Sequence, residues 1–341
     1  MSAYLCIDSV CVSYGTTPVL DNVSLELQRG EMVALLGSSG CGKTTLLRAI
    51  AGFVQPTSGR IVVDGRDITA LPPEARQTAM MFQSYALWPH MNVAANIGYG
   101  LRMRGAAKAA IAARVEEILK LLQLEGFGPR AVTALSGGQR QRVAMGRALA
   151  VDPLLLLLDE PMSNLDYKVR LDLRHELRAL QRRVGITAIY VTHDREEALT
   201  LADRIAVIDA GRVVQFGTPE EIFHRPASPF VAGFMGADNA VDVVHDGPQM
   251  RLADEATPAG ARTRAHFRGD RARLAHGPAD ASLSLDGTIE QASYLGHGWR
   301  YRVRVGRGQI WVDDPAQVPE GSHTHVIVPR DALLLFPAAP P

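Results

Sequence analysis

Short, continuous apolar runs recur between residues 30 and 210. Met32–Leu36, Leu154–Leu158 and Ala188–Val191 are apolar or aromatic at every position. Runs without alternation are typical of parallel strands that are buried on both faces of a sheet. Lys108–Leu124, which lies between two of them, instead carries apolar side chains at helical spacing. The pattern therefore predicts an α/β fold interrupted by a helical insertion.

Other segments alternate apolar and polar residues, which predicts antiparallel β hairpins. Residues 4–28 alternate on both sides of a turn at Tyr14–Pro18, and residues 299–312 alternate around Gly306–Gly308. A further hairpin is expected where Ile205–Ile208 and Val213–Phe216 flank a short turn. The composition changes beyond residue 235, where the apolar segments are strand-like, so the tail is predicted to be a small β domain.

Gly37–Thr44 reads Gly-Ser-Ser-Gly-Cys-Gly-Lys-Thr and matches the phosphate-binding loop pattern at every defined position. It follows the run Met32–Leu36 and precedes a predicted helix, which is the strand–loop–helix context that the pattern requires. In such a loop, backbone N–H groups and the helix N-terminus converge on a phosphate chain. We expect Lys43 to reach the β- and γ-phosphates of a nucleotide and Thr44 to ligate Mg²⁺.

Polar side chains follow three other predicted strands. We expect Asp159 to hold Mg²⁺ and Glu160 to orient or deprotonate the attacking water. Gln83 can touch the metal or that water, and His193 can bind a γ-phosphate and brace Glu160. Each residue has an ordinary alternative when taken alone: a cap or solvated turn for the acids, a solvated loop for Gln83 and a structural role for His193. The set as a whole favours catalysis.

A second anion-binding helix terminus is predicted at Leu135–Gln139, where Ser136 precedes two glycines and a helix. The chain therefore has one nucleotide loop but two helix ends that seek phosphate, and one of them needs a phosphate from another molecule. Tyr14, just ahead of its turn, can stack on an adenine, although packing is the more usual role of such an aromatic residue.

Length, charge and cysteine content limit the number of domains, the kind of partner and the redox compartment. A chain of 341 residues is expected to form two domains. Lys plus Arg and Asp plus Glu each total 36, so bulk electrostatics give no sign of a nucleic-acid binder. Cys6 and Cys11 are expected on opposite faces of one strand and Cys41 lies in the phosphate loop, so no disulfide framework is implied, which fits a reducing cytosol. We find no secretory-signal pattern and no apolar run near the length of a membrane span.

Two further segments leave alternatives open. Tyr85–Met91 is unusually apolar for a loop, so it is either core or a docking surface. A group of arginines in the tail is either a basic patch for an anion or a solvated edge strand, and the edge strand is favoured. These arginines are Arg262, Arg264, Arg268, Arg271 and Arg273.

Taken together, the motifs resemble those of the ATP-binding cassette family over about residues 4–235. They stand in family order: the phosphate loop, the Q-loop Gln83, the signature Leu135–Gln139, the pair Asp159–Glu160, the D-loop 163–166 and His193. The tail, 236–341, resembles the oligonucleotide-fold-like (TOBE) domain of some importers. The resemblance implies a P-loop NTPase cassette, residues 1–235, with an antiparallel β subdomain and a helical subdomain at about 85–150, and the small all-β domain follows it.

The resemblance also assigns roles to individual residues. It implies that the catalytic residues are Glu160, His193, Gln83 and Lys43, and that the metal ligands are Thr44, Gln83 and Asp159. The residues that it implies contact the nucleotide are Tyr14, Gly37, Ser38, Ser39, Gly40, Cys41, Gly42, Lys43, Thr44, Thr45, Gln83, Ser136, Gly137, Gly138, Gln139 and Asp166. Asn164 stands where relatives usually carry Ala, and Ala95 stands where a Glu is common. Asn164 puts the tightness of coupling between two cassettes in doubt.

As implied by the resemblance, the chain is the ATPase of an importer, with ATP and Mg²⁺ as cofactors. Two copies pair head to tail, each signature closing over the other's ATP. The dimer acts at the cytoplasmic face of the inner membrane on two permease subunits, with Tyr85–Met91 as the dock, and an external solute-binding protein supplies the cargo. No nucleic-acid partner is expected. Ferric iron, phosphonate and polyamines are favoured over sugars as cargo.

Two rival hypotheses remain. One is a cassette ATPase without a transport role, in translation or DNA repair; such proteins usually carry two cassettes or a long coiled coil, and this chain has one cassette and no sustained heptads. The other is a regulatory cassette, in which the C-terminal domain senses a ligand and ATP turnover is slow.

Overall fold

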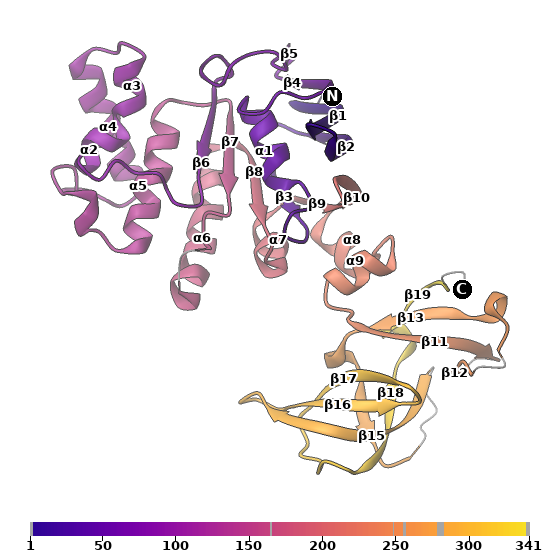
Figure 1. Cartoon of the computed structure of the whole chain (residues 1–341). Helices are drawn as coiled ribbons and strands as arrows, with labels where there is room; N and C mark the ends of the chain where they lie inside the picture. Colours follow the sequence, from indigo (N-terminus) through magenta and orange to yellow (C-terminus); the bar gives the residue numbers. More distant parts are fainter. Residues whose placement is uncertain (1–2, 164–165, 248, 255–256, 278–282, 339–341) are drawn as a thin grey trace. The chain divides into compact units, whose positions relative to one another are not determined.

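A computed structural model describes residues 3–163, 166–247, 249–254, 257–277 and 283–338 (Figure 1). Asn164 and Leu165 of the predicted D-loop lie outside the described residues. The chain divides into two compact units, one ending at Pro219 and the other beginning at Glu220.

A six-stranded sheet with the order β10-β9-β3-β8-β7-β6 forms the centre of the first unit. Its strands are β3 (Met32–Leu36), β6 (Thr78–Met81), β7 (Leu155–Asp159), β8 (Thr187–Thr192), β9 (Arg204–Asp209) and β10 (Arg212–Gly217). The five strands β9, β3, β8, β7 and β6 run parallel, and β10 pairs antiparallel with β9 at the edge. The buried apolar runs and the closing hairpin are thus placed as the sequence predicts.

Adjacent residues of the central strands belong to two different cores on the two faces of this sheet. Leu155 and Leu157 pack in one core with helix α1 (Lys43–Ala51), and Leu156 and Leu158 pack in the other with helices α5 (Gly137–Ala150) and α6 (Tyr167–Val184). Both faces are apolar because both are covered by other elements, as is usual for parallel sheets.

A four-stranded sheet, β2-β1-β4-β5, joins the core on the α1 face. Its strands are β1 (Leu5–Tyr14), β2 (Thr17–Leu27), β4 (Ser58–Val63) and β5 (Arg66–Asp67). The first two form the predicted hairpin. Cys6 and Cys11 do not lie on opposite faces, however: Ser9 adopts φ 54° at a register shift, so both cysteines alternate with buried residues on the less buried face. All three cysteines are free.

The stretch between β6 and β7 is helical, as predicted (Figure 1). It contains α2 (Val93–Ile97), α3 (Tyr99–Met103), α4 (Lys108–Leu121), the 3₁₀ turn η2 (Val132–Ala134) and α5. Helix α4 buries Val115, Ile118 and Leu119, which is the stripe that the sequence predicts. The first unit also contains η1 (Pro73–Ala75) and α7 (Arg195–Leu201). No helix among the described residues combines the length and apolarity needed to span a membrane.

Helices α8 (Pro219–His224) and α9 (Pro229–Phe234) precede an all-β fold in the second unit. Its strands follow the path β14-β18-β15-β12-β11-β13-β19, with β16 and β17 joined to β15. The bounds are β11 (Asn239–Asp246), β12 (Gln249–Leu252), η3 (Ala259–Ala261), β13 (Thr263–Phe267), η4 (Gly269–Arg271), β14 (Arg273–Ala275), β15 (Leu283–Tyr294), β16 (Trp299–Val305), β17 (Gly308–Asp314), β18 (His323–Val328), η5 (Arg330–Ala332) and β19 (Leu334–Pro337). The hairpin of β16 and β17 is the predicted one.

The tail arginines do not form one edge strand. Arg273 does lie on β14, at an end of the strand path, but Arg264 lies on β13, which is paired on both sides by β11 and β19. Arg264 pairs with Asp242, Arg271 pairs with Asp331 and Arg262 donates to the carbonyl oxygen of Thr257. The edge-strand prediction is therefore wrong for Arg264, and internal pairing engages much of the group.

Candidate functional site

The phosphate loop joins β3 to α1, and its glycines are favoured by left-handed backbone angles or by close packing. Gly42 has φ 106° and Gly40 has φ 81°, a region that favours glycine. A Cβ added to Gly37 would lie 2.2 Å from the carbonyl oxygen of Ile208. Lys43 is buried, and its Nζ donates to the carbonyl oxygens of Gly37 and Ser38 at 2.8 Å. The loop is thus compact around a single buried ammonium group.

Thr44 and Asp159 come together from α1 and β7. Thr44 Oγ1 donates a hydrogen bond to Asp159 Oδ1 over 3.1 Å. Burial raises the pKa of Asp159, and Glu160 adds to this, whereas the bond from Thr44 and the charges of Arg48 and Lys43 oppose it. A hydroxyl and a carboxylate placed side by side supply the hard oxygen atoms that Mg²⁺ prefers.

Glu160 and His193 also meet, from β7 and β8. Glu160 Oε1 lies 3.2 Å from His193 Nδ1. Glu160 adopts φ 43°, and its amide donates to the carbonyl oxygen of Val191 over 3.1 Å. The His193 side chain is 58% exposed and that of Glu160 is 23% exposed, so both can reach a bound molecule.

The sheet order explains why these residues share one edge. The phosphate loop follows β3, His193 follows β8, Asp159 and Glu160 stand at the end of β7, and Gln83 follows β6. These four strands are parallel neighbours, so their carboxyl ends lie together. Gln83 is exposed there, two residues beyond Met81, which pairs with Leu158. Ligands of open α/β sheets bind at this edge.

The signature segment lies on a different layer. Ser136 caps α5 with its Oγ on the amide of Gln139, and the Gln139 side chain returns a bond to the amide of Ser136. This capping box fixes the helix terminus. Helix α5 packs in the core on the opposite face of the sheet from α1.

The remaining predicted contacts stand apart. Tyr14, at the end of β1, is 53% exposed and its ring is open to a partner. Asp166 caps α6 by accepting from the amide of Val169, so its side chain already has a structural role. Tyr85–Met91 is divided: Tyr85 is buried, Leu87 and Trp88 are half-buried, and Ala86, Pro89 and His90 are exposed. The loop is therefore partly core and partly surface.

A buried network around His193 was missed by sequence reasoning. Tyr190 and Thr192 both donate to Glu197 Oε2 at 2.7 Å, and the Thr192 hydroxyl also accepts from the amide of Asp194. Burial raises the pKa of Tyr190 well above its usual range, and the charge of Glu197 adds to this. Arg174 of α6 reaches Asp194 at 2.9 Å. The only sequence signal was an acidic residue beside the histidine that could cap α7.

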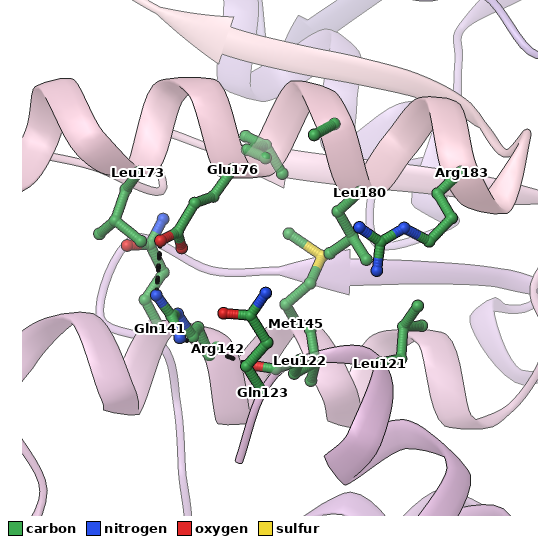
Figure 2. A pocket seen from close by; sticks show the side chains of 12 residues that line it. Leu121, Leu122, Gln123, Gln141, Arg142, Met145, Leu173, Glu176, Leu180 and Arg183 are labelled. Carbon is green, nitrogen blue, oxygen red and sulfur yellow. Dashed lines mark hydrogen bonds and ion pairs between the residues drawn. The ribbon is translucent and has the colours of Figure 1, made fainter.

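A cleft of about 130 Å³ lies between α5, α6 and the end of α4 (Figure 2). Its walls are mainly apolar, with Leu121, Leu122, Met145, Leu173, Leu177 and Leu180 among them. Arg142 bridges its rim by donating to Glu176 and to the carbonyl oxygen of Leu122. The residues that line the cleft include none from the phosphate loop or the strand ends described above.

Comparison with known proteins agrees with this geometry. Residues 20–163 match the ABC transporter family and residues 267–336 match the TOBE domain. The chain is 49% identical to an sn-glycerol-3-phosphate import ATP-binding protein of Rhizobium johnstonii, with 86% of this chain and 83% of that protein covered. It is 45% identical to an Fe(3+) ions import ATP-binding protein of Rhizobium meliloti, with 90% of each covered.

Two further proteins, one of them a solved structure, are also similar to this chain. A spermidine/putrescine import ATP-binding protein of Mesorhizobium japonicum is 47% identical, with 87% of this chain and 84% of that protein covered. The solved structure of cbiO1 from Clostridium perfringens, described as part of an ABC transporter complex, is 30% identical with a TM-score of 0.61, covering 66% of this chain and 92% of that one.

The chain therefore belongs to the ATP-binding cassette family of transport ATPases. It binds ATP and hydrolyses it through an α/β cassette, and it carries a TOBE-type all-β domain. The predicted family, fold class and ATPase activity are confirmed. The roles of the individual site residues stay predictions.

Proposed function

We propose that this chain is the ATP-hydrolysing subunit of an importer and works as a homodimer on two permease subunits at the cytoplasmic face of the inner membrane. An external solute-binding protein would deliver the cargo. The observation that carries the proposal is the gathering of Lys43, Thr44, Asp159, Glu160 and His193 at one sheet edge. The names of the relatives, which are import ATP-binding proteins, support the importer role.

Mg²⁺ fits the residues present. Thr44 and Asp159 would hold it with Gln83, and Mg²⁺ supplies positive charge to the phosphates when bound. Asp159 favours this role because its carboxylate is buried and its raised pKa reflects a charge without enough compensation, which a cation would relieve. Lys43 would exchange the carbonyl oxygens of Gly37 and Ser38 for phosphate oxygens.

Glu160 would act on the attacking water. Its carboxylate would take the proton as the water oxygen bonds to the γ-phosphorus and the bond from that phosphorus to the β–γ bridging oxygen breaks, which releases ADP and phosphate. His193 would hold Glu160 in place through the 3.2 Å contact. The left-handed backbone of Glu160, with φ 43°, is a strained conformation of the kind that clusters at functional sites. Tyr14 would stack on the adenine because its ring is exposed beside the turn.

The homodimer rests on the separation of the two phosphate-binding helix ends. Helix α5 belongs to the core on the face of the sheet opposite α1, so the signature Leu135–Gln139 and the phosphate loop occupy separate layers. A second copy brings its signature, and the neighbouring Asp166, to the ATP of the first. We propose residues 1–235 and 236–341 as the two functional domains, because the first strand of the all-β fold, β11, begins at Asn239.

For the cargo, we propose ferric iron, phosphonate or a polyamine. Relatives named for Fe(3+) and for spermidine/putrescine import support two of these, and a relative named for sn-glycerol-3-phosphate import supports a phosphorus-containing solute. Uptake of each solute by cells with and without this chain decides among them. Uptake unchanged for all three solutes would contradict the proposal.

The central test is Glu160→Gln in the full chain. The variant is expected to bind Mg-ATP, to remain dimeric in equilibrium sedimentation and to lose turnover, because Gln cannot accept the proton. Glu117→Gln, on the exposed face of α4, is the matched control and should keep wild-type turnover. Wild-type turnover in Glu160→Gln would refute the assigned base. Reconstituted permease should stimulate the wild-type ATPase; no stimulation by any candidate permease would favour the non-transport or regulatory cassette.

A further inference from the structure

Arg147 of helix α5 holds the loop that follows Gln83. Its Nη2 donates to the carbonyl oxygen of Tyr85 over 2.8 Å, and its Nη1 donates to the carbonyl oxygen of Ala86. The same helix begins at the signature, after the Ser136 cap. One side chain therefore connects the signature helix to the segment that leaves β6.

The two carbonyl groups belong to a backbone that needs support. Tyr85 has φ 63° and Ala86 has φ 46°, and neither is glycine. A left-handed conformation costs such residues roughly 1–2 kcal/mol each. It persists only where the surroundings fix it. The fork of the Arg147 guanidinium, which meets both carbonyl groups, is that support.

Gln83 lies in a turn that this backbone closes. The amide of Tyr85 donates to the carbonyl oxygen of Phe82 over 2.8 Å, so residues 82–85 form a turn in which the exposed Gln83 is the second residue. Arg147 fixes the residue that closes this turn. A displacement of Arg147 would therefore also displace Tyr85 and the turn that contains Gln83.

The far end of the loop is fixed as well. The Asn96 side chain is fully buried; it accepts from the amide of Trp88 over 2.9 Å and donates to the carbonyl oxygen of Trp88. The Trp88 ring lies 3.9 Å from that of Tyr99, centroid to centroid, and the Arg147 guanidinium carbon lies 4.8 Å from the Trp88 ring. Side chains of the helical segment therefore hold the loop both where it leaves the Gln83 turn and at Trp88.

Arg147 is partly buried, and partial removal of a cation from water carries a cost. Removal from water lowers the pKa of Arg147. A cation that is taken from water must regain its lost hydration from nearby groups. Here it does so from two carbonyl oxygens and the face of Trp88.

We propose that Arg147 is a positioning residue for ATP hydrolysis that acts through Gln83. It carries the position of the signature helix α5 to the turn that presents Gln83 at the strand ends. The inference rests on the role proposed above for Gln83. Arg147 itself touches neither nucleotide nor metal in this scheme.

A double-mutant cycle on the full chain tests the proposal: Gln83→Ala, Arg147→Gln and the double variant, with kcat and KM for ATP measured for each. Each single variant is expected to lower kcat by roughly tenfold or more, because misplacement of a catalytic group has effects of this size. KM for ATP should change less than kcat, because Lys43, Thr44 and Asp159 would still hold the nucleotide and Mg²⁺ when the Gln83 contact is lost. The double variant should be no slower than Gln83→Ala alone, because both changes remove one function.

The outcomes separate the two proposals. If the double variant shows the product of the two single effects, or if Arg147→Gln keeps the wild-type kcat, Arg147 does not act through Gln83 and the inference fails while the role of Gln83 stands. If Gln83→Ala keeps the wild-type kcat, the role of Gln83 fails, and the inference fails with it.

A stability measurement distinguishes a lower kcat caused by misplacement of Gln83 from one caused by unfolding of the variant. The thermal midpoint of Arg147→Gln is compared with that of Arg142→Gln, on the same helix, whose guanidinium pairs with Glu176 at the rim of the cleft in Figure 2. Arg142→Gln should keep the wild-type kcat. If Arg147→Gln fails to fold, the cycle is repeated with Arg147→Lys, which keeps the charge but cannot donate to both carbonyl groups as a fork. For Arg147→Lys, the expected result and the results that would overturn the inference are those given above for Arg147→Gln.

Discussion

Glu160 Oε1 lies 3.2 Å from Nδ1 of His193, and the sheet itself holds the two residues at this distance. They leave neighbouring parallel strands in which Asp159 pairs with Val191. The amide of Glu160 donates to the carbonyl oxygen of Val191, so the backbone fixes the pair before any ligand binds. Such preorganisation is what a proton acceptor near a reacting water needs.

Replacement of His193 by Ala should lower kcat for ATP hydrolysis by roughly 10²–10⁴-fold, because Glu160 loses the group that orients it. KM for ATP should change little, since the phosphate loop is untouched. Steady-state ATPase assays measure both values. His175→Ala, an exposed histidine on α6, is the control and should behave as the wild type. A kcat for His193→Ala that matches the control would contradict the role of His193.

Asp159→Asn should stabilise the ligand-free protein at pH 7 by about 0.5–2 kcal/mol, while it abolishes hydrolysis. Burial raises the pKa of Asp159 above its ordinary value of 3.8, so the ionised carboxylate costs free energy in the folded state. This cost is fully present above the folded pKa of Asp159 and is absent below the unfolded value of 3.8. The stabilisation of Asp159→Asn relative to the wild type should therefore shrink as the pH falls from the folded pKa to 3.8. Denaturant unfolding at several pH values measures it. A gain that is constant with pH would contradict the assignment.

Asp203→Asn should have the opposite sign. Burial acts to raise the pKa of Asp203, but hydrogen bonds from Arg178 and from the amide of Met32 outweigh it and the pKa is lowered. The folded pKa lies below 3.8, so the stabilisation is present above 3.8 and is lost as the pH falls through the folded value. The variant should lose about 1 kcal/mol at neutral pH, a modest value because the Asp203 side chain is 38% exposed. The same unfolding series applies, and a stabilised variant at pH 7 would count against this account.

Gly37→Ala should destabilise the protein by about 1–3 kcal/mol, because the new Cβ would overlap the backbone carbonyl of Ile208, which cannot turn aside. Gly138→Ala is the matched control: its Cβ would lie 3.5 Å from the Leu173 side chain, an ordinary contact. Thermal unfolding of the two variants measures the difference. Equal midpoints would show that the loop can shift to accept the methyl group.

Arg76→Met should destabilise the protein by about 2–4 kcal/mol, because four carbonyl groups lose a donor. The Arg76 side chain is buried and donates to the carbonyl oxygens of Ala49 and Ile50 at the end of α1, and to those of Leu71 and Thr69. Arg66→Met, on the exposed edge strand β5, should change the unfolding free energy by less than about 0.5 kcal/mol. If both variants unfold alike, the buried guanidinium does not hold the end of α1.

The sequence was sufficient for those parts of the site that depend on local order. The phosphate loop could be placed because its glycines, its lysine and its flanking strand and helix are adjacent in the chain. The pairings of Thr44 with Asp159 and of Glu160 with His193 could be anticipated because parallel strands bring their ends to one edge.

The missed features depend on contacts between distant residues. Arg147 donates to the carbonyl oxygen of Tyr85, and Arg76 donates to that of Ala49. Every residue has a backbone carbonyl group, so the sequence does not show which of them accepts from an arginine. The faces of Cys6 and Cys11 were predicted wrongly because Ser9 takes a left-handed conformation that no residue type signalled.

The alternation of β7 between two cores has a mechanical consequence. Leu155 and Leu157 pack on one face against the layer that carries the phosphate loop. Leu156 and Leu158 pack on the other face against the layer that carries the signature helix. Any sliding of one layer past the other must therefore shear this strand. Its last residue is Asp159 and Glu160 comes next, so a relative displacement of the two layers would also displace these acidic side chains.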